Sequence, residues 1–170
     1  MFDVSSIRII PDFPKAGINF YDITTLLNNP KEFHNAIQDM LCIAKEARPD
    51  VVVAFEARGF FFGSTLAYLL DVPFVPIRKK GKLPGTVFSE SYDLEYGQDA
   101  VEIHQGSIQP NQRILLIDDI LATGGTMNAG IRLVEHFNPA SIDILFLMEL
   151  KDLNGREKFS GYNVHSIVQL

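Results

Sequence analysis

The sequence predicts an α/β fold: a doubly wound, mostly parallel sheet with helices on both faces. Short apolar runs rich in Val, Ile and Leu alternate along the chain with segments whose apolar residues recur every three or four positions. Strands that alternate with helices form βαβ units, which build parallel sheets with right-handed crossovers. The chain has 170 residues, 46% of them hydrophobic, which is enough for one core. Because no repeat or low-complexity tract interrupts it, we expect a single domain over residues 1–170.

The individual elements follow from local patterns. The first helix is expected to begin at Asn29 and Pro30, because Asn caps a helix well and Pro needs no N–H partner in its first turn. It should end before Pro49, since the residue before a proline avoids the helical conformation. Apolar periodicity predicts further helices over residues 59–70 and 125–136. Strands are expected at residues 51–55, 74–77, 113–117, 142–150 and 164–168.

Residues 78–97 fit neither periodicity and are rich in Lys, Gly, Pro, Ser and Glu. No helix or strand is expected over residues 78–97. Long loops are uncommon inside compact domains and are usually functional or mobile. We therefore expect residues 82–97 to form a flexible loop beside the functional site.

Charge and cysteine content exclude several classes of protein. The chain carries 15 Lys and Arg against 21 Asp and Glu, a net charge of −6, so it lacks the basic surplus of a nucleic-acid binder. Its one cysteine, Cys42, cannot form an internal disulfide, and its apolar neighbours predict a buried residue. No apolar run approaches the roughly 20 residues of a membrane span, and the first residues do not resemble a secretory signal. We expect a cytoplasmic protein with no nucleic-acid or membrane partner.

Residues 114–126, ILLIDDILATGGT, carry the strongest chemical signal. Asp118 and Asp119 end an apolar strand, so they should lie at the edge of the sheet rather than in its core, where open parallel sheets bind ligands. The Thr-Gly-Gly-Thr string then opens a helix whose N–H groups attract an anion, and its threonines add hydroxyl donors. The carboxylates suit sugar hydroxyls, so the segment fits a ribose 5-phosphate, although a plain Gly-Gly turn with an Asp cap is the alternative. The expected contacts are Asp118, Asp119, Ala122, Thr123, Gly124, Gly125 and Thr126.

Five segments resemble the type I phosphoribosyltransferases. IDDILATGGT is similar to the motif with which this family binds phosphoribosyl diphosphate. Taken in order over nearly the whole chain, the five segments resemble the members that act on adenine. That resemblance implies the type I phosphoribosyltransferase fold, with an N-terminal hood over the base formed by residues 1–28. The other four segments are PDFPKAGINFYDIT (11–24), EARGFFFG (56–63), RKKGKLPG (78–85) and SYDLEYG (91–97).

The resemblance also implies an activity. It indicates a purine salvage enzyme that converts adenine and 5-phosphoribosyl 1-diphosphate to AMP and diphosphate through an oxocarbenium-like transition state. Mg²⁺ would be held mainly by the substrate, and no histidine clusters with Cys or carboxylates at the spacing of a zinc site. A homodimer is implied as well. Two alternatives stay open: transfer to hypoxanthine, guanine or xanthine, and a regulator that senses the donor.

The family's Leu-Glu-Tyr-Gly motif is matched by residues 94–97 and implies that Glu95 is catalytic, handling a proton near N7 of the purine. Arg58 opens a helix after the 51–55 strand and offers a bidentate donor to phosphate oxygens. A cis peptide around Glu56-Ala57 is also implied, as is the reach of Lys82 into the neighbouring subunit's site. For single lysines of this basic stretch, a solvated loop is the alternative. The implied diphosphate contacts are Arg58, Arg78, Lys79 and Lys82.

The implied adenine contacts include positions where this chain departs from the family. The family usually has an aliphatic residue in place of Asn19 and Arg in place of Tyr21, while Ala16 and Thr25 replace prolines. Recognition by main-chain atoms would tolerate these changes. Phe13 suits either the site or the core equally well. The implied adenine contacts are Asn19, Phe20, Tyr21, Ala122 and Leu150.

Overall fold

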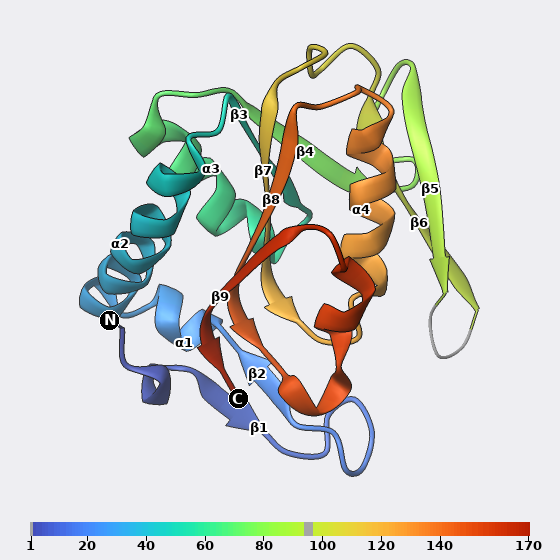
Figure 1. Ribbon diagram of the computed structural model, residues 1–170. Coiled ribbons are helices and arrows are strands. Elements are labelled where there is room, and N and C mark those ends of the chain that lie inside the picture. The colour runs from blue at the N-terminus through green and yellow to red at the C-terminus, as the bar shows by residue number, and fades with distance from the viewer. Residues whose placement is uncertain (1, 94–96) are drawn as a thin grey trace. The chain divides into compact units, whose positions relative to one another are not determined.

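The computed structural model describes residues 2–93 and 97–170, which form two compact units (Figure 1). The first unit is Met1–Asp39 and the second is Met40–Leu170, and each is described here by itself. Within the described residues, no helix is both long enough and apolar enough to cross a membrane.

The first unit contains a small antiparallel sheet that the sequence did not predict. Strand β1 (Arg8–Ile10) pairs with β2 (Phe20–Asp22), so that Arg8 lies opposite Asp22. The other elements of this unit are the short helices η1 (Val4–Ser6) and α1 (Thr24–Leu27) and the first part of α2 (Pro30–Ala47).

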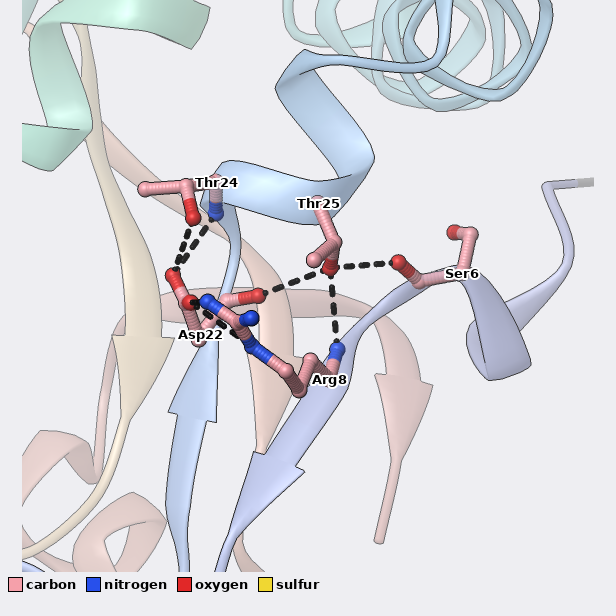
Figure 2. A network of polar contacts seen from close by, with 5 residues as sticks. All are labelled: Ser6, Arg8, Asp22, Thr24 and Thr25. Carbon is pink, nitrogen blue, oxygen red and sulfur yellow. Dashed lines mark hydrogen bonds and ion pairs between the residues drawn. The ribbon is translucent and has the colours of Figure 1, made fainter.

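Asp22 organises the polar contacts of the first unit (Figure 2). Its Oδ1 accepts hydrogen bonds from Thr24 N at 2.9 Å and Thr24 Oγ1 at 2.7 Å, and its Oδ2 accepts one from Arg8 Nε at 3.2 Å. Thr25 Oγ1 donates to the Ser6 carbonyl at 2.7 Å and accepts from Arg8 N at 3.0 Å. The hydrogen bonds from Thr24, followed by that from Arg8, lower the pKa of Asp22 to about 2. The network therefore fixes the strand pair and the start of α1.

The second unit is built on a seven-stranded sheet of order β5-β6-β4-β3-β7-β8-β9. The strands from β4 to β9 in that order are parallel, whereas β6 is antiparallel to both β4 and β5. The predicted α/β fold with a mostly parallel sheet is therefore confirmed. The strands are β3 (Val51–Phe55), β4 (Phe74–Lys79), β5 (Val87–Asp93), β6 (Gln98–His104), β7 (Arg113–Leu121), β8 (Ser141–Glu149) and β9 (Asn163–Gln169).

Helices α3 (Arg58–Leu70) and α4 (Gly125–Glu135) cover opposite faces of this sheet (Figure 1). Successive strand residues point to opposite faces, and the neighbours Ala54 and Phe55 show this directly. A Cβ added to Gly63 of α3 would lie 2.5 Å from Ala54 Cβ, and one added to Gly130 of α4 would lie 2.2 Å from Phe55 Cζ. Both helices use a glycine to approach the sheet, which confirms the doubly wound arrangement.

The apolar pattern of the sequence predicted the positions of most helices and strands correctly. All residues of β3 are buried, and α2, α3 and α4 occupy the expected ranges, with Glu32 N donating to the side chain of Asn29 at 3.3 Å. Two expectations about single residues and strand ends were wrong. Cys42 is exposed rather than buried, and β7 does not stop at residue 117 but runs through the two aspartates to Leu121.

The absence of regular structure predicted for residues 78–97 was also wrong. β4 continues to Lys79, and β5 forms a hairpin with β6, which the sequence did not predict either. Residues 94–96, which include the predicted catalytic Glu95, lie outside the described residues. The flexibility of residues 82–97 stays a prediction.

Candidate active site

A cavity of about 180 Å³ lies in the second unit, where β3 and β7 lead into α3 and α4. It brings together Arg58 and all the residues predicted to contact ribose and the 5′-phosphate. The predicted placement of this site beyond the carboxyl ends of parallel strands matches the geometry. The lining residues are Arg58, Asp118, Asp119, Ile120, Leu121, Ala122, Thr123, Gly124, Gly125, Thr126, Met127 and Phe146.

One wall of the cavity is the glycine turn (residues 122–126), which leads into α4. Gly124 is the N-cap of α4 and has a φ of 76°, a left-handed conformation that favours glycine. In the described part of the chain, no side chain caps this helix start. The first N–H groups of α4 therefore have no acceptor within the helix. They lie at its N-terminal end, where the helix dipole attracts an anion. Thr123 is exposed beside them.

The two acids also line the cavity, and here the structure corrects the prediction. Asp119 was expected at the edge of the sheet, but it is only 2% exposed because β7 continues past it and pairs with β8. Its N–H donates to Asp118 Oδ1 at 2.9 Å. Gly59 allows α3 to begin close by, since a Cβ there would lie 3.0 Å from Asp118 Oδ1.

Arg58 and Asp119 form an ion pair at the cavity, with Arg58 Nε 2.9 Å from Asp119 Oδ2. Within the described residues that oxygen accepts no hydrogen bond of good geometry, so the contact is electrostatic rather than a directed hydrogen bond. Burial, followed by the charge of Asp119, raises the pKa of Asp118 well above its usual range. Burial also raises the pKa of Asp119, against the opposing effect of Arg58. A ligand that donates hydrogen bonds to these oxygens would relieve that unfavourable burial.

The remaining predicted diphosphate residues do not line this cavity. Arg78 Nη2 pairs with Glu56 Oε1 at 2.8 Å, and Arg78 Nη1 donates to the Lys82 carbonyl at 3.0 Å. Lys79 Nζ lies 3.3 Å from Asp99 Oδ2, and Lys82 is exposed. The Arg78 hydrogen bonds lower the pKa of Glu56, which is therefore a fixed anion. Glu56 directly precedes the start of α3, and the Glu56–Ala57 peptide is cis, as the family resemblance implies.

The five predicted adenine contacts are divided between the two units. Ala122 lines the cavity, and Leu150 lies near it, because its N–H donates to the Leu121 carbonyl at 2.8 Å. Asn19 precedes β2 in the first unit, and Phe20 and Tyr21 lie on that strand.

Phe13, which suited either the core or the site, belongs to the surface of the first unit. Its ring is edge-on to that of Phe20, with ring centroids 5.2 Å apart, and the residue is 51% exposed. The pairing presents an aromatic surface at Phe20, the residue expected to stack on the base.

Four lining residues were missed by sequence reasoning: Ile120, Leu121, Met127 and Phe146. The first two and Met127 lie within or beside the predicted segment, but Phe146 comes from the neighbouring strand. It reaches the cavity because the sheet register sets it opposite Asp118. Strand register is not readable from one sequence. No group of three His, Cys, Asp or Glu residues in the described part of the chain is arranged to hold a metal ion.

Comparison with known proteins assigns the family. The model of the phosphoribosyl transferase domain matches residues 22–169. The chain belongs to the phosphoribosyltransferase family. The adenine phosphoribosyltransferase of Clostridium tetani is 50% identical to this phosphoribosyltransferase over 96% of the chain and 95% of its own length. That of Desulfitobacterium hafniense is 48% identical, with coverages of 96% and 94%.

Solved structures agree with the sequence relatives. The crystal structure of adenine phosphoribosyltransferase from Thermoanaerobacter pseudethanolicus matches with a TM-score of 0.91 at 49% identity, covering 98% of this chain and 96% of that one. The Saccharomyces cerevisiae enzyme, solved with adenine and an imino-altritol bisphosphate, matches with a TM-score of 0.91 at 39% identity and coverages of 96% and 94%. The predicted resemblance to the type I phosphoribosyltransferases and the predicted fold are therefore confirmed.

Proposed function

We propose that this phosphoribosyltransferase converts adenine and 5-phosphoribosyl 1-diphosphate to AMP and diphosphate, a purine salvage reaction. The observation that carries the proposal is that the glycine turn, the Asp118–Asp119 pair and Arg58 all line the same cavity. A ligand with a phosphate, vicinal hydroxyls and a second anionic group would match these three features in turn: the glycine turn, the acid pair and Arg58. The relatives named above support adenine as the acceptor, and the Trypanosoma brucei relative was solved with AMP, pyrophosphate and ribose-5-phosphate.

The 5′-phosphate is assigned to the glycine turn. The uncapped N–H groups of α4 donate to its oxygens, the helix dipole adds positive potential, and Thr123 and Thr126 add hydroxyl donors. Gly124 allows the left-handed conformation with which the turn enters α4, and Gly125 leaves the first turn of that helix without a side chain.

The ribose hydroxyls are assigned to Asp118 and Asp119. Carboxylates accept hydrogen bonds from hydroxyl groups, and burial raises the pKa of both acids, so a ligand that donates hydrogen bonds to them would favour their charged forms. Positive charge that develops at the anomeric carbon during bond cleavage would be stabilised by these carboxylates.

The diphosphate leaving group is assigned to Arg58, Arg78, Lys79 and Lys82. Arg58 lines the cavity beside Asp119, and its planar guanidinium suits the oxygens of a phosphate group. The donors of this region are cations and N–H groups, which suits an anion that brings its own Mg²⁺. That Mg²⁺, bound to the diphosphate, would neutralise charge on the leaving group.

Adenine is assigned to Asn19, Phe20, Tyr21, Ala122 and Leu150, and the proton near N7 to Glu95 as a general base. Residues 1–28 are proposed to cover the base and residues 82–97 to exclude water from the reacting centre. These roles come from the family resemblance. The same resemblance supports a homodimer in which Lys82 reaches the neighbouring site.

Incubation with 5-phosphoribosyl 1-diphosphate, Mg²⁺ and one purine at a time, followed by separation of the nucleotides, tests the proposal. AMP should form with adenine and no nucleotide with hypoxanthine, guanine or xanthine. A product from another purine would favour the alternative acceptor, and donor binding without any product would favour a regulator. E95A should lower turnover while donor affinity is kept, with the exposed Glu46→Ala as the matched control.

A further inference from the structure

The glycine turn is held from behind by η3 (Gly155–Phe159), a short helix near the C-terminus. A Cβ on Gly155 would lie 2.2 Å from the Ala122 carbonyl oxygen. A Cβ on Gly124 would lie 2.8 Å from the Gly155 carbonyl oxygen and 2.8 Å from Phe159 Cζ. The two backbones are therefore in direct contact, with no space for a side chain between them.

Phe159 extends this contact to the wall of the cavity. It is 2% exposed and its ring is stacked near that of Phe146, with centroids 6.5 Å apart and an angle of 27° between the planes. Phe146 lines the cavity. A displacement of η3 would therefore move both the glycine turn and the part of the cavity lined by Phe146.

Arg156 is the residue that ties η3 to the sheet. Its Nε donates to Glu149 Oε1 at 2.9 Å, its Nη1 to the Val164 carbonyl at 2.6 Å and its Nη2 to Ser166 Oγ at 3.0 Å. Glu149 is 5% exposed, and its Oε2 accepts a further hydrogen bond from Ser166 Oγ at 2.8 Å. One guanidinium thus joins η3 to the ends of β8 and β9.

The glycine turn needs such support because its own sequence does not fix it. Two adjacent glycines leave the backbone many conformations, and in the described chain no side chain caps the helix that follows. Its N–H groups bind a phosphate well only if they converge on it, and an error of about 1 Å in position can cost on the order of a hundredfold in rate.

We propose that Arg156, through its ion pair with Glu149, is a positioning residue for the 5′-phosphate. It holds η3 against residues 122–124 and does not itself contact the substrate. This inference rests on the proposed function, which places the 5′-phosphate at the glycine turn.

Two variants of Arg156 test the inference, with ribose 5-phosphate and diphosphate as separate probes. R156Q should raise the Kd for ribose 5-phosphate by roughly tenfold and the KM for 5-phosphoribosyl 1-diphosphate similarly, since coupled positions typically change affinity by this order. The Kd for diphosphate, which is assigned to residues outside the glycine turn and η3, and kcat at saturating donor should change less than about twofold. R156K keeps the charge but not the planar fork, so its shift should lie between those of R156Q and the wild type.

Arg113→Gln is the matched control. Arg113 pairs with Asp50 through Nη2 at 2.7 Å, at the start of β7 and therefore at the opposite end of the sheet from the cavity. Its loss should lower the melting temperature while leaving the Kd for ribose 5-phosphate unchanged.

Three results would overturn the inference: unchanged ribose 5-phosphate affinity in R156Q, equal losses for ribose 5-phosphate and diphosphate, or an equal effect of the Arg113 variant. If R156Q does not fold, R156K carries the test, and wild-type affinity in that variant is the contradicting result. Failure of the proposed function looks different, because the wild-type protein would then form no AMP or bind no ribose 5-phosphate.

Discussion

Replacing Gly124 by Ala should damage both the stability of the fold and the phosphate site. Gly106 provides a matched control, because its φ of 78° is nearly the same as the 76° of Gly124. A Cβ on Gly106 would meet nothing within 4 Å, whereas one on Gly124 would lie 2.8 Å from a backbone oxygen and from a buried ring. The difference in stability between G124A and G106A therefore measures only the overlap of the added Cβ at residue 124 with its neighbours.

The size of the effect follows from these two terms. A left-handed conformation costs an L-residue about 1 kcal/mol, and both variants incur this cost. The overlap at Gly124 adds roughly 2 kcal/mol, typical of an extra methyl group in a packed interior. For a domain of this size, 1 kcal/mol corresponds to about 2–4 °C in melting temperature. We expect a loss of about 2–4 °C for G106A and roughly 6–12 °C for G124A.

Thermal unfolding of the two variants gives the first measurement, and calorimetric titration with ribose 5-phosphate gives the second. G106A should bind the ligand with wild-type affinity, and G124A should bind it at least tenfold more weakly, because η3 and the turn can no longer pack as they do. Equal melting temperatures for the two variants would refute the close approach. Wild-type affinity in G124A would refute the role of the turn.

Three further predictions concern other parts of the molecule. G125A should leave the melting temperature unchanged, because the nearest described atom to its Cβ would be 3.7 Å away. It should weaken the binding of ribose 5-phosphate, because the phosphate is assigned to this turn. An unaltered Kd would contradict that. The raised pKa of Asp118 means that stability is lost as the pH rises through it, so D118N, which keeps the acceptor for Asp119 N, should melt higher at pH 7 while turnover falls. A lower melting temperature at pH 7 would be the opposing result. The pKa of about 2 for Asp22 means that its stabilisation is present above 3.8 and disappears as the pH falls through about 2. The Thr24 amide shift in NMR spectra should titrate with that midpoint, and a midpoint near 3.8 would rule out the network.

Elements with uninterrupted apolar patterns could be predicted from the sequence. β3, β7 and β8 lie in the middle of a parallel sheet with both faces covered, so each contains a continuous apolar run. The β5–β6 hairpin could not be predicted in this way because charged residues occupy partly or fully buried positions. Glu90 of β5 is paired with Arg132 of α4 at 2.9 Å, and Glu102 of β6 accepts a hydrogen bond from Gly81 N at 2.9 Å. Such pairing hides the alternation that marks a strand.

The residues of the candidate site also fall into those that the sequence could predict and those that it could not. Residues contiguous with the Asp118–Asp119 pair could be predicted, because one strand, one turn and one helix start carry them. The wall at Phe146 depends on strand register, and the support at Arg156 depends on contacts with β8 and β9. Both come from tertiary packing, to which the local pattern of residues gives no access.

The most direct test of the account is a crystal structure of the protein with AMP. The account predicts the phosphate on the N–H groups of residues 123–126 and the ribose hydroxyls on the carboxylates of Asp118 and Asp119. A nucleotide bound elsewhere, with this cavity filled only by water, would contradict it.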